Sequence, residues 1–296
     1  KLGQRYSEPT KPTMIECVTP EKITDSVAFH GEGPVWHESW GGLRWVDMLA
    51  GDLLTLTSSG EIIRTPTGSK IAAFVRPRAN GGYVVGVERG LALADSPFDT
   101  PVLQPEIWSD TNVRMNEGGV DPQGRLYAGS MPYDRTPGAG KLYRIDDDGA
   151  ATVVLPHVTT SNGIDFTADG SKAYYNDTAT RGTDVFDVVD GELTNRRVFY
   201  FVGEGISPDG LTVDSEGNVW TALNRLGVVR LYSPEAEILG EWKLPCPGVT
   251  AVTLGGEDGK DVFIATSKDM KDVPEAGAIY HMRADVAGQP TREYQG

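Results

Sequence analysis

A pair of short apolar stretches joined by a glycine-containing turn recurs along the chain, and this repeat most constrains the fold. Clear copies occupy residues 120–131, 164–177 and 211–223. Turns of the Asp-Gly, Gly-Asn and Gly-Gly type indicate hairpins, because their residues tolerate positive φ angles. A further apolar stretch with its own turn follows the pairs, as in residues 141–155 and 185–199. The repeat therefore predicts a series of four-stranded antiparallel sheets.

The spacing of the repeat predicts how these sheets are arranged. Six residues that mark successive units are separated by 48, 38, 44, 47 and 41 residues. A period of about 40–50 residues with four strands per unit is typical of β-propeller blades, and the chain lacks the helical patterns of a doubly wound α/β fold. We expect an all-β, six-bladed β-propeller with four-stranded blades around a central channel, as one domain over residues 1–296. The markers are Glu32, Asn80, Gly118, Asn162, Asp209 and Thr250.

The two ends of the ring must also meet in such a fold. Residues 14–30 are expected to complete the last blade and close the ring, whereas residues 1–13 form a loosely ordered N-terminal extension. The first residues carry no apolar stretch of the kind found in export signals.

Charge and cysteine content exclude several classes of partner. Asp and Glu number 42 against 27 Lys and Arg, which gives a net charge of −15. Such a chain repels polyanions, so nucleic acid and anionic membrane surfaces are excluded as partners. No apolar run approaches the ~18 residues of a membrane span. Cys17 and Cys246 are too few for a disulfide framework. We expect a cytoplasmic protein without an obligate protein partner.

Polar residues near the start of the innermost strands are candidates for a functional site. Those strands line the channel of a propeller, so such residues converge at one channel mouth although they are far apart in sequence. Glu32, Asn162 and Asp209 occupy this position and supply oxygen atoms. Two carboxylates and an amide suit Ca²⁺, Mg²⁺ or Mn²⁺ better than a structural zinc site. The alternative is that Asn162 and Asp209 are turn residues, because Asn-Gly and Asp-Gly are common in turns. Their recurrence favours the metal site.

Four ordered segments carry a resemblance to a known family. They read GEGPVW (31–36), RMNEGGVDPQGRLYAGSM (114–131), SNGIDF (161–166) and SPDGLTVDSEGNVW (207–220). These segments resemble the signatures of the gluconolactonase/regucalcin family, also called senescence marker proteins. The resemblance implies a six-bladed propeller that binds one divalent cation in its channel and hydrolyses sugar lactones. It also implies functional roles for five residues, with Glu32, Asn162 and Asp209 as metal ligands and Arg114 and Asn116 as substrate contacts.

The chain departs from the family pattern around the substrate. Asn116 is followed by Glu117 where the family commonly has aspartate, and Tyr133 stands near an acidic position of the animal members, with Asp134 next to it. The loop that begins at Tyr133 is polar and contains glycine, and such loops commonly set specificity. We therefore expect Tyr133 and Asp134 to contact the substrate, with the metal site retained and the substrate contacts altered.

These residues lead to a mechanistic hypothesis. A channel cation, with Ca²⁺ expected and Mg²⁺, Mn²⁺ or Zn²⁺ as alternatives, would polarise the carbonyl of a small-molecule lactone and activate a water. Asp209 would act as both ligand and general base. Two alternatives remain open: a hydrolase of another cyclic ester or organophosphate on the same site, and a non-catalytic metal-binding propeller. Two carboxylates, an amide and an arginine at one channel mouth favour the enzyme.

Overall fold

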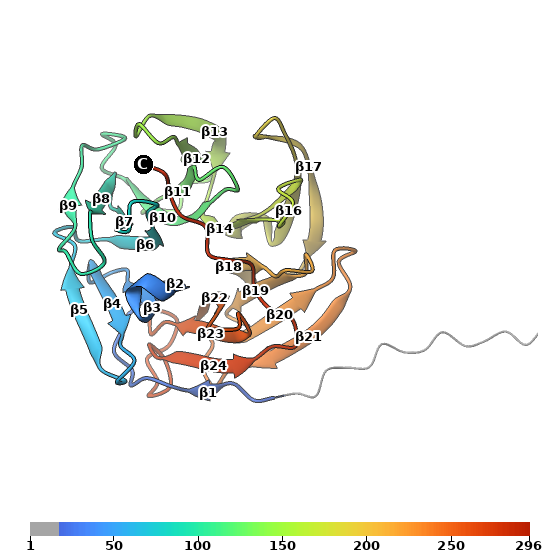
Figure 1. Ribbon diagram of the computed structural model, residues 1–296. Coiled ribbons are helices and arrows are strands. Elements are labelled where there is room, and N and C mark those ends of the chain that lie inside the picture. The colour runs from blue at the N-terminus through green and yellow to red at the C-terminus, as the bar shows by residue number, and fades with distance from the viewer. Residues whose placement is uncertain (1–17) are drawn as a thin grey trace, which may run out of the picture.

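Six antiparallel sheets surround a central channel in the computed structural model, which describes residues 18–296 (Figure 1). Each sheet has four strands, and in five of the six sheets these strands follow one another along the chain. This arrangement confirms the predicted all-β, six-bladed β-propeller with four-stranded blades. The predicted N-terminal extension, residues 1–13, lies outside the described residues.

The blades are numbered in chain order, and each begins with the strand that lines the channel. These innermost strands contact one another around the ring. In blades one to five the strands are β2 (Gly31–His37), β3 (Gly42–Asp47), β4 (Asp52–Leu56) and β5 (Ile62–Pro66); β6 (Ala72–Pro77), β7 (Tyr83–Val87), β8 (Leu91–Ala94) and β9 (Val102–Leu103); β10 (Val113–Val120), β11 (Leu126–Pro132), β12 (Gly140–Ile145) and β13 (Ala151–Val158); β14 (Ser161–Phe166), β15 (Lys172–Asp177), β16 (Gly182–Val189) and β17 (Glu192–Phe201); and β18 (Ser207–Val213), β19 (Val219–Asn224), β20 (Val228–Tyr232) and β21 (Ile238–Lys243).

The sixth blade joins the two ends of the chain. It consists of β22 (Val249–Gly255), β23 (Asp261–Thr266), β24 (Ile279–Arg283) and β1 (Glu21–Lys22). Beyond the strand pair itself, Ile23 N donates a hydrogen bond of 3.0 Å to the carbonyl oxygen of Ile279. The N-terminal segment thus shields the outer edge of β24, and an unpaired edge strand would otherwise be open to association. Residues 14–17 of the predicted ring-closing segment lie outside the described residues.

Helices are almost absent from the part of the chain that the structure describes. It contains two short 3₁₀ helices, η1 (Glu38–Trp40) and η2 (Thr178–Thr180). Over the same residues, no helix has the length and apolar character needed to cross a membrane.

Buried aspartates organise the hairpins that give the sequence its repeat. Asp121 Oδ1 accepts hydrogen bonds of 2.9 Å from the backbone N–H groups of Gln123 and Arg125. Asp214 repeats this pattern two blades later with Glu216 and Asn218, at 3.0 and 2.9 Å. Each carboxylate thereby satisfies turn donors between the first and second strands of its blade. The recurring Asp-x-x-Gly pattern in the sequence is therefore the sequence of these hydrogen-bonded turns.

The period of the repeat is confirmed, but two of its markers are wrong. The innermost strands begin at intervals of 41, 41, 48, 46 and 42 residues. Asn80 lies in the turn between β6 and β7, and Gly118 lies inside β10. Strand β6 reads AAFVRP and lacks a polar residue followed by glycine. The following turn, residues 80–82, reads Asn-Gly-Gly and so has the same pattern of a polar residue followed by glycine.

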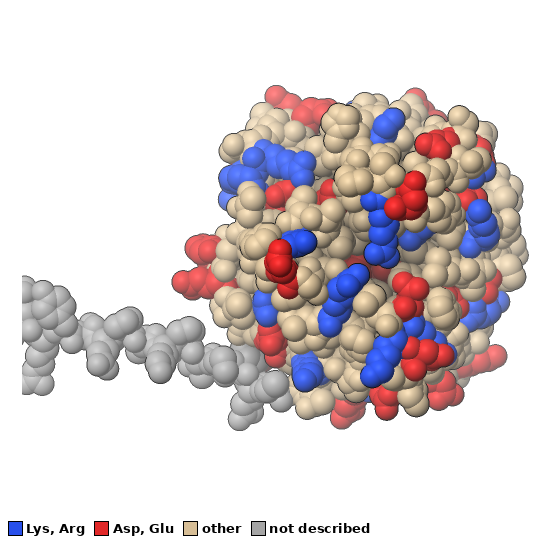
Figure 2. Space-filling view, turned by 180° about the vertical axis from the view of Figure 1, so that it is seen from behind, with Lys and Arg blue, Asp and Glu red and all other residues tan. Residues whose placement is uncertain are grey.

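The two ends of the channel differ. The segment after β24 runs across one end (Figure 1), where Gln289 Nε2 donates hydrogen bonds of 2.9 Å to the carbonyl oxygens of Phe166 and Val213. Arg292 pairs with Asp165 at 2.8 Å on the same side. This segment leaves a cavity of about 100 Å³ between itself and the channel wall. Figure 2 shows the opposite end, where the innermost strands begin and where Lys and Arg side chains border a central hollow.

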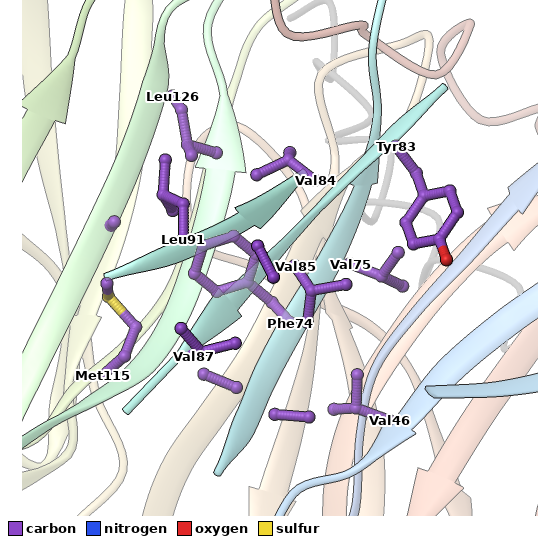
Figure 3. Packing of buried hydrophobic residues seen from close by; sticks show 14 of the residues in the cluster. Val46, Phe74, Val75, Tyr83, Val84, Val85, Val87, Leu91, Met115 and Leu126 are labelled. Carbon is purple, nitrogen blue, oxygen red and sulfur yellow. The ribbon is translucent and has the colours of Figure 1, made fainter. Parts of the chain in front are cut away.

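The hydrophobic core lies between neighbouring blades. Its largest cluster joins blades one to three, and Figure 3 shows the ring of Phe74 with Val85 and Leu91 beside it and Met115 toward blade three. A Cβ atom on Gly118 would overlap the ring of Phe74. Glycine at this position therefore makes room for an aromatic side chain from the adjacent blade. Packing between blades, rather than within one sheet, buries the apolar faces.

Replacing a buried turn aspartate should destabilise the fold much more than replacing an exposed one. Asp214 is fully buried and its Oδ2 also accepts from Trp220 Nε1 at 3.2 Å. We expect Asp214→Ala to lower the free energy of unfolding by about 3 kcal/mol or more, because it leaves several buried donors without an acceptor. The matched control is Asp169→Ala, which removes an exposed turn carboxylate bonded to Ser171 N at 3.0 Å. Denaturant unfolding should give about 1 kcal/mol or less for the control, and equal losses would contradict the proposed role of burial.

Candidate active site

Every innermost strand has an interruption in its pairing register near the channel end seen in Figure 2. Such bulges redirect a side chain and are common beside active sites. The positions within or at the start of the interruption are therefore equivalent around the ring. They are Glu32, Ala73, Asn116, Asn162, Asp209 and Thr250. The structure thus brings together the three predicted metal ligands and one predicted substrate contact, Asn116.

Glycines that follow the predicted ligands allow the innermost strands to approach closely. A Cβ atom on Gly163 would overlap the backbone nitrogen of Leu211 in the next blade. A Cβ atom on Gly210 would lie 2.8 Å from Cα of Ala251. Gly163 lies inside strand β14, and Gly210 lies inside strand β18. The alternative that Asn162 and Asp209 are turn residues is therefore wrong. Glycine is needed here for contact between blades.

Two buried carboxylates lie at this end of the channel. Glu32 is 3% exposed and Asp209 is 7% exposed. Burial, followed by the charge of Glu117, raises the pKa of Glu32 well above its ordinary value. Burial, followed by the charge of Glu32, does the same to the pKa of Asp209. The two carboxylates therefore repel each other in a region with little water.

One oxygen of this pair has no partner. Asp209 Oδ2 accepts a hydrogen bond of 2.9 Å from Asn224 Nδ2, which orients the carboxylate. Oδ1 of Asp209 is buried and has no hydrogen-bond partner among residues 18–296. Glu32 Oε2 accepts at 3.3 Å from Gly33 N, and its Oε1 lies 3.6 Å from His30 Nε2. An unpartnered buried carboxylate oxygen is a group that a cation would satisfy.

The amide of Asn162 is oriented by its neighbours. Its Nδ2 donates to Thr178 Oγ1 at 2.7 Å, and that hydroxyl donates to the carbonyl oxygen of Pro208 at 2.7 Å. The amide nitrogen is engaged on the side of Thr178. The amide oxygen Oδ1 therefore faces the opposite side, where it accepts a hydrogen bond of 3.3 Å from Asn116 Nδ2. The arrangement presents the amide oxygen rather than the nitrogen, as a metal ligand requires.

These donors fit a hard divalent cation. Two carboxylates and an amide oxygen match the ligand preference of Ca²⁺ and Mg²⁺. Two negative charges would balance the charge of such an ion, and Asp209 Oδ1 would gain the partner that it lacks. Within the described chain, no three His, Cys, Asp or Glu side chains gather as a metal cluster, so the fit depends on including the amide of Asn162.

Arg114 and Asn116 form a second layer beside the carboxylates. Arg114 NH1 donates to Asn116 Oδ1 at 2.7 Å and to the carbonyl oxygen of Met115 at 2.9 Å. Asn116 Nδ2 donates to the carbonyl oxygen of Ser161 at 2.7 Å. Among residues 18–296, no hydrogen bond engages Nε or NH2 of Arg114. The guanidinium is therefore fixed at one nitrogen and retains donors for another molecule.

Tyr133 lies beside Arg114. Its hydroxyl donates to Glu88 Oε1 at 2.7 Å, and Lys70 Nζ lies 2.8 Å from the same carboxylate. The Arg114 guanidinium is 5.9 Å from the centre of the Tyr133 ring, within the range of a cation–π contact. Tyr133 is 40% exposed, so its ring borders the opening rather than the core.

Asp134 differs from the other predicted site residues. It lies in the exposed loop after β11, and its Oδ1 accepts a hydrogen bond of 2.9 Å from Thr136 N. This bond closes a local turn. In the described part of the chain, no hydrogen bond or ion pair joins Asp134 to Arg114, Asn116 or the carboxylate pair.

Sequence reasoning missed several supporting residues, which share one position in the blade. Glu88, Thr178 and Asn224 lie at or just after the end of the second strand of their blades. In an antiparallel pair, that end is adjacent to the start of the first strand. Applying the rule used for the first strands to the ends of the second strands would have found all three.

The chain is similar to known proteins over almost its whole length. Residues 30–268 match the family profile described as the SMP-30/Gluconolactonase/LRE-like region. Regucalcin of Danio rerio is 32% identical over 296 residues, which cover 95% of this chain and 98% of that protein. A pentonolactonase of Haloferax volcanii is 30% identical over 287 residues, covering 92% and 97%. The solved structure of a calcium-binding protein, regucalcin, from Agrobacterium tumefaciens has a TM-score of 0.86 at 23% identity, covering 95% of this chain and 98% of that one.

The buried carboxylates predict an unusual pH dependence of stability in the absence of metal. Burial raises the folded-state pKa values of Glu32 and Asp209 above their unfolded-state values. At any pH between the unfolded-state and folded-state pKa values, the folded chain therefore binds more protons than the unfolded chain. Their contribution to stability is therefore lost as pH rises from about 4 through the folded pKa values.

This dependence can be measured on chelator-treated protein by denaturant unfolding between pH 5 and pH 8. We expect Glu32→Gln to stabilise the metal-free protein at pH 8 and to flatten its pH dependence. The control Asp187→Asn changes a carboxylate in β16 that pairs with Arg197 at 2.8 Å, and it should leave the slope unchanged. A Glu32→Gln protein with the wild-type slope would contradict the assignment.

Proposed function

The chain belongs to the SMP-30/gluconolactonase/LRE-like family, and from this premise we propose that it is a divalent-metal-dependent lactonase acting on sugar lactones. The observation that carries the proposal is the buried pair Glu32 and Asp209, with Oδ1 of Asp209 unpartnered within the described chain, at the open end of the channel. A lactonase is consistent with the pentonolactonase among the relatives. The polar border made by Arg114, Asn116 and Tyr133 supports a substrate that carries hydroxyl groups.

Glu32, Asn162 and Asp209 would hold the cation. Bound there, a divalent ion would supply Lewis-acid polarisation of the lactone carbonyl and would lower the pKa of a coordinated water. Ca²⁺ is the ion that we propose, because the donors are all oxygens and because the similar protein from Agrobacterium tumefaciens is described as calcium-binding.

Asp209 is the proposed general base. In lactone hydrolysis, the oxygen of water bonds to the carbonyl carbon, the bond between that carbon and the ring oxygen breaks, and a proton reaches the departing ring oxygen. Oδ1 of Asp209, which no group in residues 18–296 engages, would have both roles: it would lie against the cation and accept the proton of the attacking water. The same carboxyl group would then donate that proton to the ring oxygen, so that the product is a hydroxy acid.

Arg114 and Asn116 would orient the substrate. The hydrogen bond of 2.7 Å between Arg114 NH1 and Asn116 Oδ1 holds both side chains beside the carboxylates. The remaining guanidinium donors would bind a hydroxyl or ring oxygen of the sugar, and arginine cannot lose its charge when it is desolvated. Tyr133, held by Glu88, would contact the distal part of the substrate.

The direct test is hydrolysis of a panel of aldono-1,4- and 1,5-lactones, followed as acid release. Chelator-treated protein should be inactive, and Ca²⁺, Mg²⁺, Mn²⁺ or Zn²⁺ should be added back separately. Activity that returns with metal supports the proposal. Tight metal binding without hydrolysis of any lactone would contradict it, and would direct attention to other cyclic esters, phosphotriesters and non-catalytic metal binding.

The role of Asp209 can be separated from general effects of charge. We expect Asp209→Asn to lower kcat roughly 100-fold or more, in line with the usual contribution of a general base. Asp187→Asn, the half-buried control in β16, should retain wild-type kcat. An Asp209→Asn protein that keeps both metal affinity and full turnover would exclude the general-base role.

The role of Tyr133 is expected to be different. Tyr133→Phe removes one hydroxyl that bonds to Glu88 at 2.7 Å and retains the ring beside Arg114. We expect KM to rise roughly threefold to tenfold, as for the loss of one hydrogen bond, while Ca²⁺ affinity measured by calorimetry stays the same. A large fall in Ca²⁺ affinity would instead place Tyr133 among the residues that support the metal site.

A further inference from the structure

A pocket of about 390 Å³ lies between blades one and two, outside the channel. Its walls come from η1, β3, β4, β5 and the turn 57–58 of blade one and from β7 and the loop 95–101 of blade two. Because η1 joins the end of β2 to β3, the pocket lies at the end of the blade remote from Glu32. Phe98, which is 80% exposed, stands at its rim. The volume is that of a small-molecule site.

Arg44 contributes an uncompensated positive charge to this pocket. The residue is 3% exposed, and within residues 18–296 no carboxylate oxygen lies within 4.0 Å of its guanidinium nitrogens. Its NH2 donates to the carbonyl oxygen of Pro97. Its Nε and NH1 are buried without a hydrogen-bond partner in the described chain. Burial lowers the pKa of Arg44 to about 10. A buried cation without a counter-charge is strongly unfavourable.

A third unpartnered donor lies beside this arginine. Trp40 Nε1, on η1, is buried and has no hydrogen-bond acceptor in the part of the chain that the structure describes. Trp40 and Arg44 both line the pocket. Native proteins leave few buried donors without acceptors, so three of them at one pocket indicate a missing acceptor group.

Aromatic rings hold the guanidinium in place. The carbon Cζ of Arg44 lies 4.7 Å from the centre of the Trp40 ring and 5.0 Å from that of Tyr83. Tyr83 is itself anchored, because its hydroxyl donates to the carbonyl oxygen of Asp99 at 2.5 Å. Cation–π contacts compensate part of the buried charge, but they give the N–H groups in the guanidinium plane no acceptor.

We propose that this pocket binds a small organic carboxylate, whose oxygens accept hydrogen bonds from Arg44 and Trp40 and whose body packs against Phe98. A carboxylate supplies both the missing negative charge and the missing acceptors. The volume exceeds that of a single inorganic ion, and the aromatic rim suits a carbon skeleton. The ligand has two chemical sources, a flat aromatic carboxylate and a polyhydroxy carboxylate of the kind that lactone opening produces.

One acidic residue near the rim has to be considered. Asp99 lines the pocket, but its side chain is exposed and makes no ion pair with Arg44 in the structure. If Asp99 served as the counter-ion, the pocket would need no ligand, and Asp99→Asn would destabilise the ligand-free protein. The experiment therefore includes this variant.

The test is thermal denaturation and calorimetry of chelator-treated protein with sodium benzoate, sodium gluconate or inorganic phosphate, with NaCl used to keep the ionic strength constant. Chelation prevents gluconate from binding through a metal in the channel. We expect benzoate, gluconate or both to raise Tm by about 2–4 °C, the shift typical of one modest ligand on a chain of this size. The compound that acts identifies the source of the carboxylate. A response to phosphate alone, or to none of the three, would overturn the proposal.

Variants test whether the ligand-induced rise in Tm comes from binding in this pocket. Arg44→Met should abolish the Tm shift and leave the ligand-free Tm unchanged or higher, because it removes an uncompensated buried charge. Trp40→Phe, which retains Arg44, should weaken binding several-fold and guards against misfolding of the first variant. Arg197→Met, in blade four, should respond like the wild type. Equal responses of Arg44→Met and the wild type, or an Asp99→Asn protein whose ligand-free Tm falls well below the wild-type value, would overturn the proposal. Loss of carboxylate binding with lactonase activity retained would leave the proposed function intact.

Discussion

Close contact between the innermost strands is the constraint on which the rest of the structure depends. Gly163 lies against the backbone of Leu211, and Gly210 lies against Ala251, so no side chain fits between these blades. The strands can then surround a channel narrow enough for Asn162 and the neighbouring carboxylates to meet. The interruptions in strand pairing at the same level point these side chains together. Backbone packing therefore creates the site before any ligand is considered.

The narrow channel also determines the electrostatics. Glu117 is a third buried acid in it, but Arg76 NH2 pairs with its Oε1 at 3.2 Å. Glu32 and Asp209 have no arginine or lysine within 4.0 Å among residues 18–296, so the uncompensated negative charge is confined to them. Arg44 presents the opposite case between blades one and two, a buried cation whose Nε and NH1 have no partner in the described chain. In both places the protein has buried a charge that an external group of opposite sign would stabilise.

Much of the site could be predicted because its determinants are local in sequence. A polar residue followed by glycine marks β2, β14 and β18 directly, and four ordered segments carry the family resemblance that the comparisons confirm. The prediction was wrong where a blade lacks this signal. Strand β6 has Ala73 at the equivalent position, so the pattern of a polar residue followed by glycine points instead to Asn80 in the next turn. In blade three the predicted marker, Gly118, lies two residues beyond the equivalent position, Asn116.

The sequence by itself determined the number of blades, the hairpin turns and four of the six equivalent channel positions, because these follow from period, turn chemistry and glycine placement within short segments. Only the tertiary structure decided that Asn116 bonds to Asn162, that Tyr133 bonds to Glu88, and that Arg44 has no counter-charge within residues 18–296. Each of these depends on how one blade packs against the next. Contacts between blades join residues tens of positions apart, and no local pattern records which side chains the packing brings together.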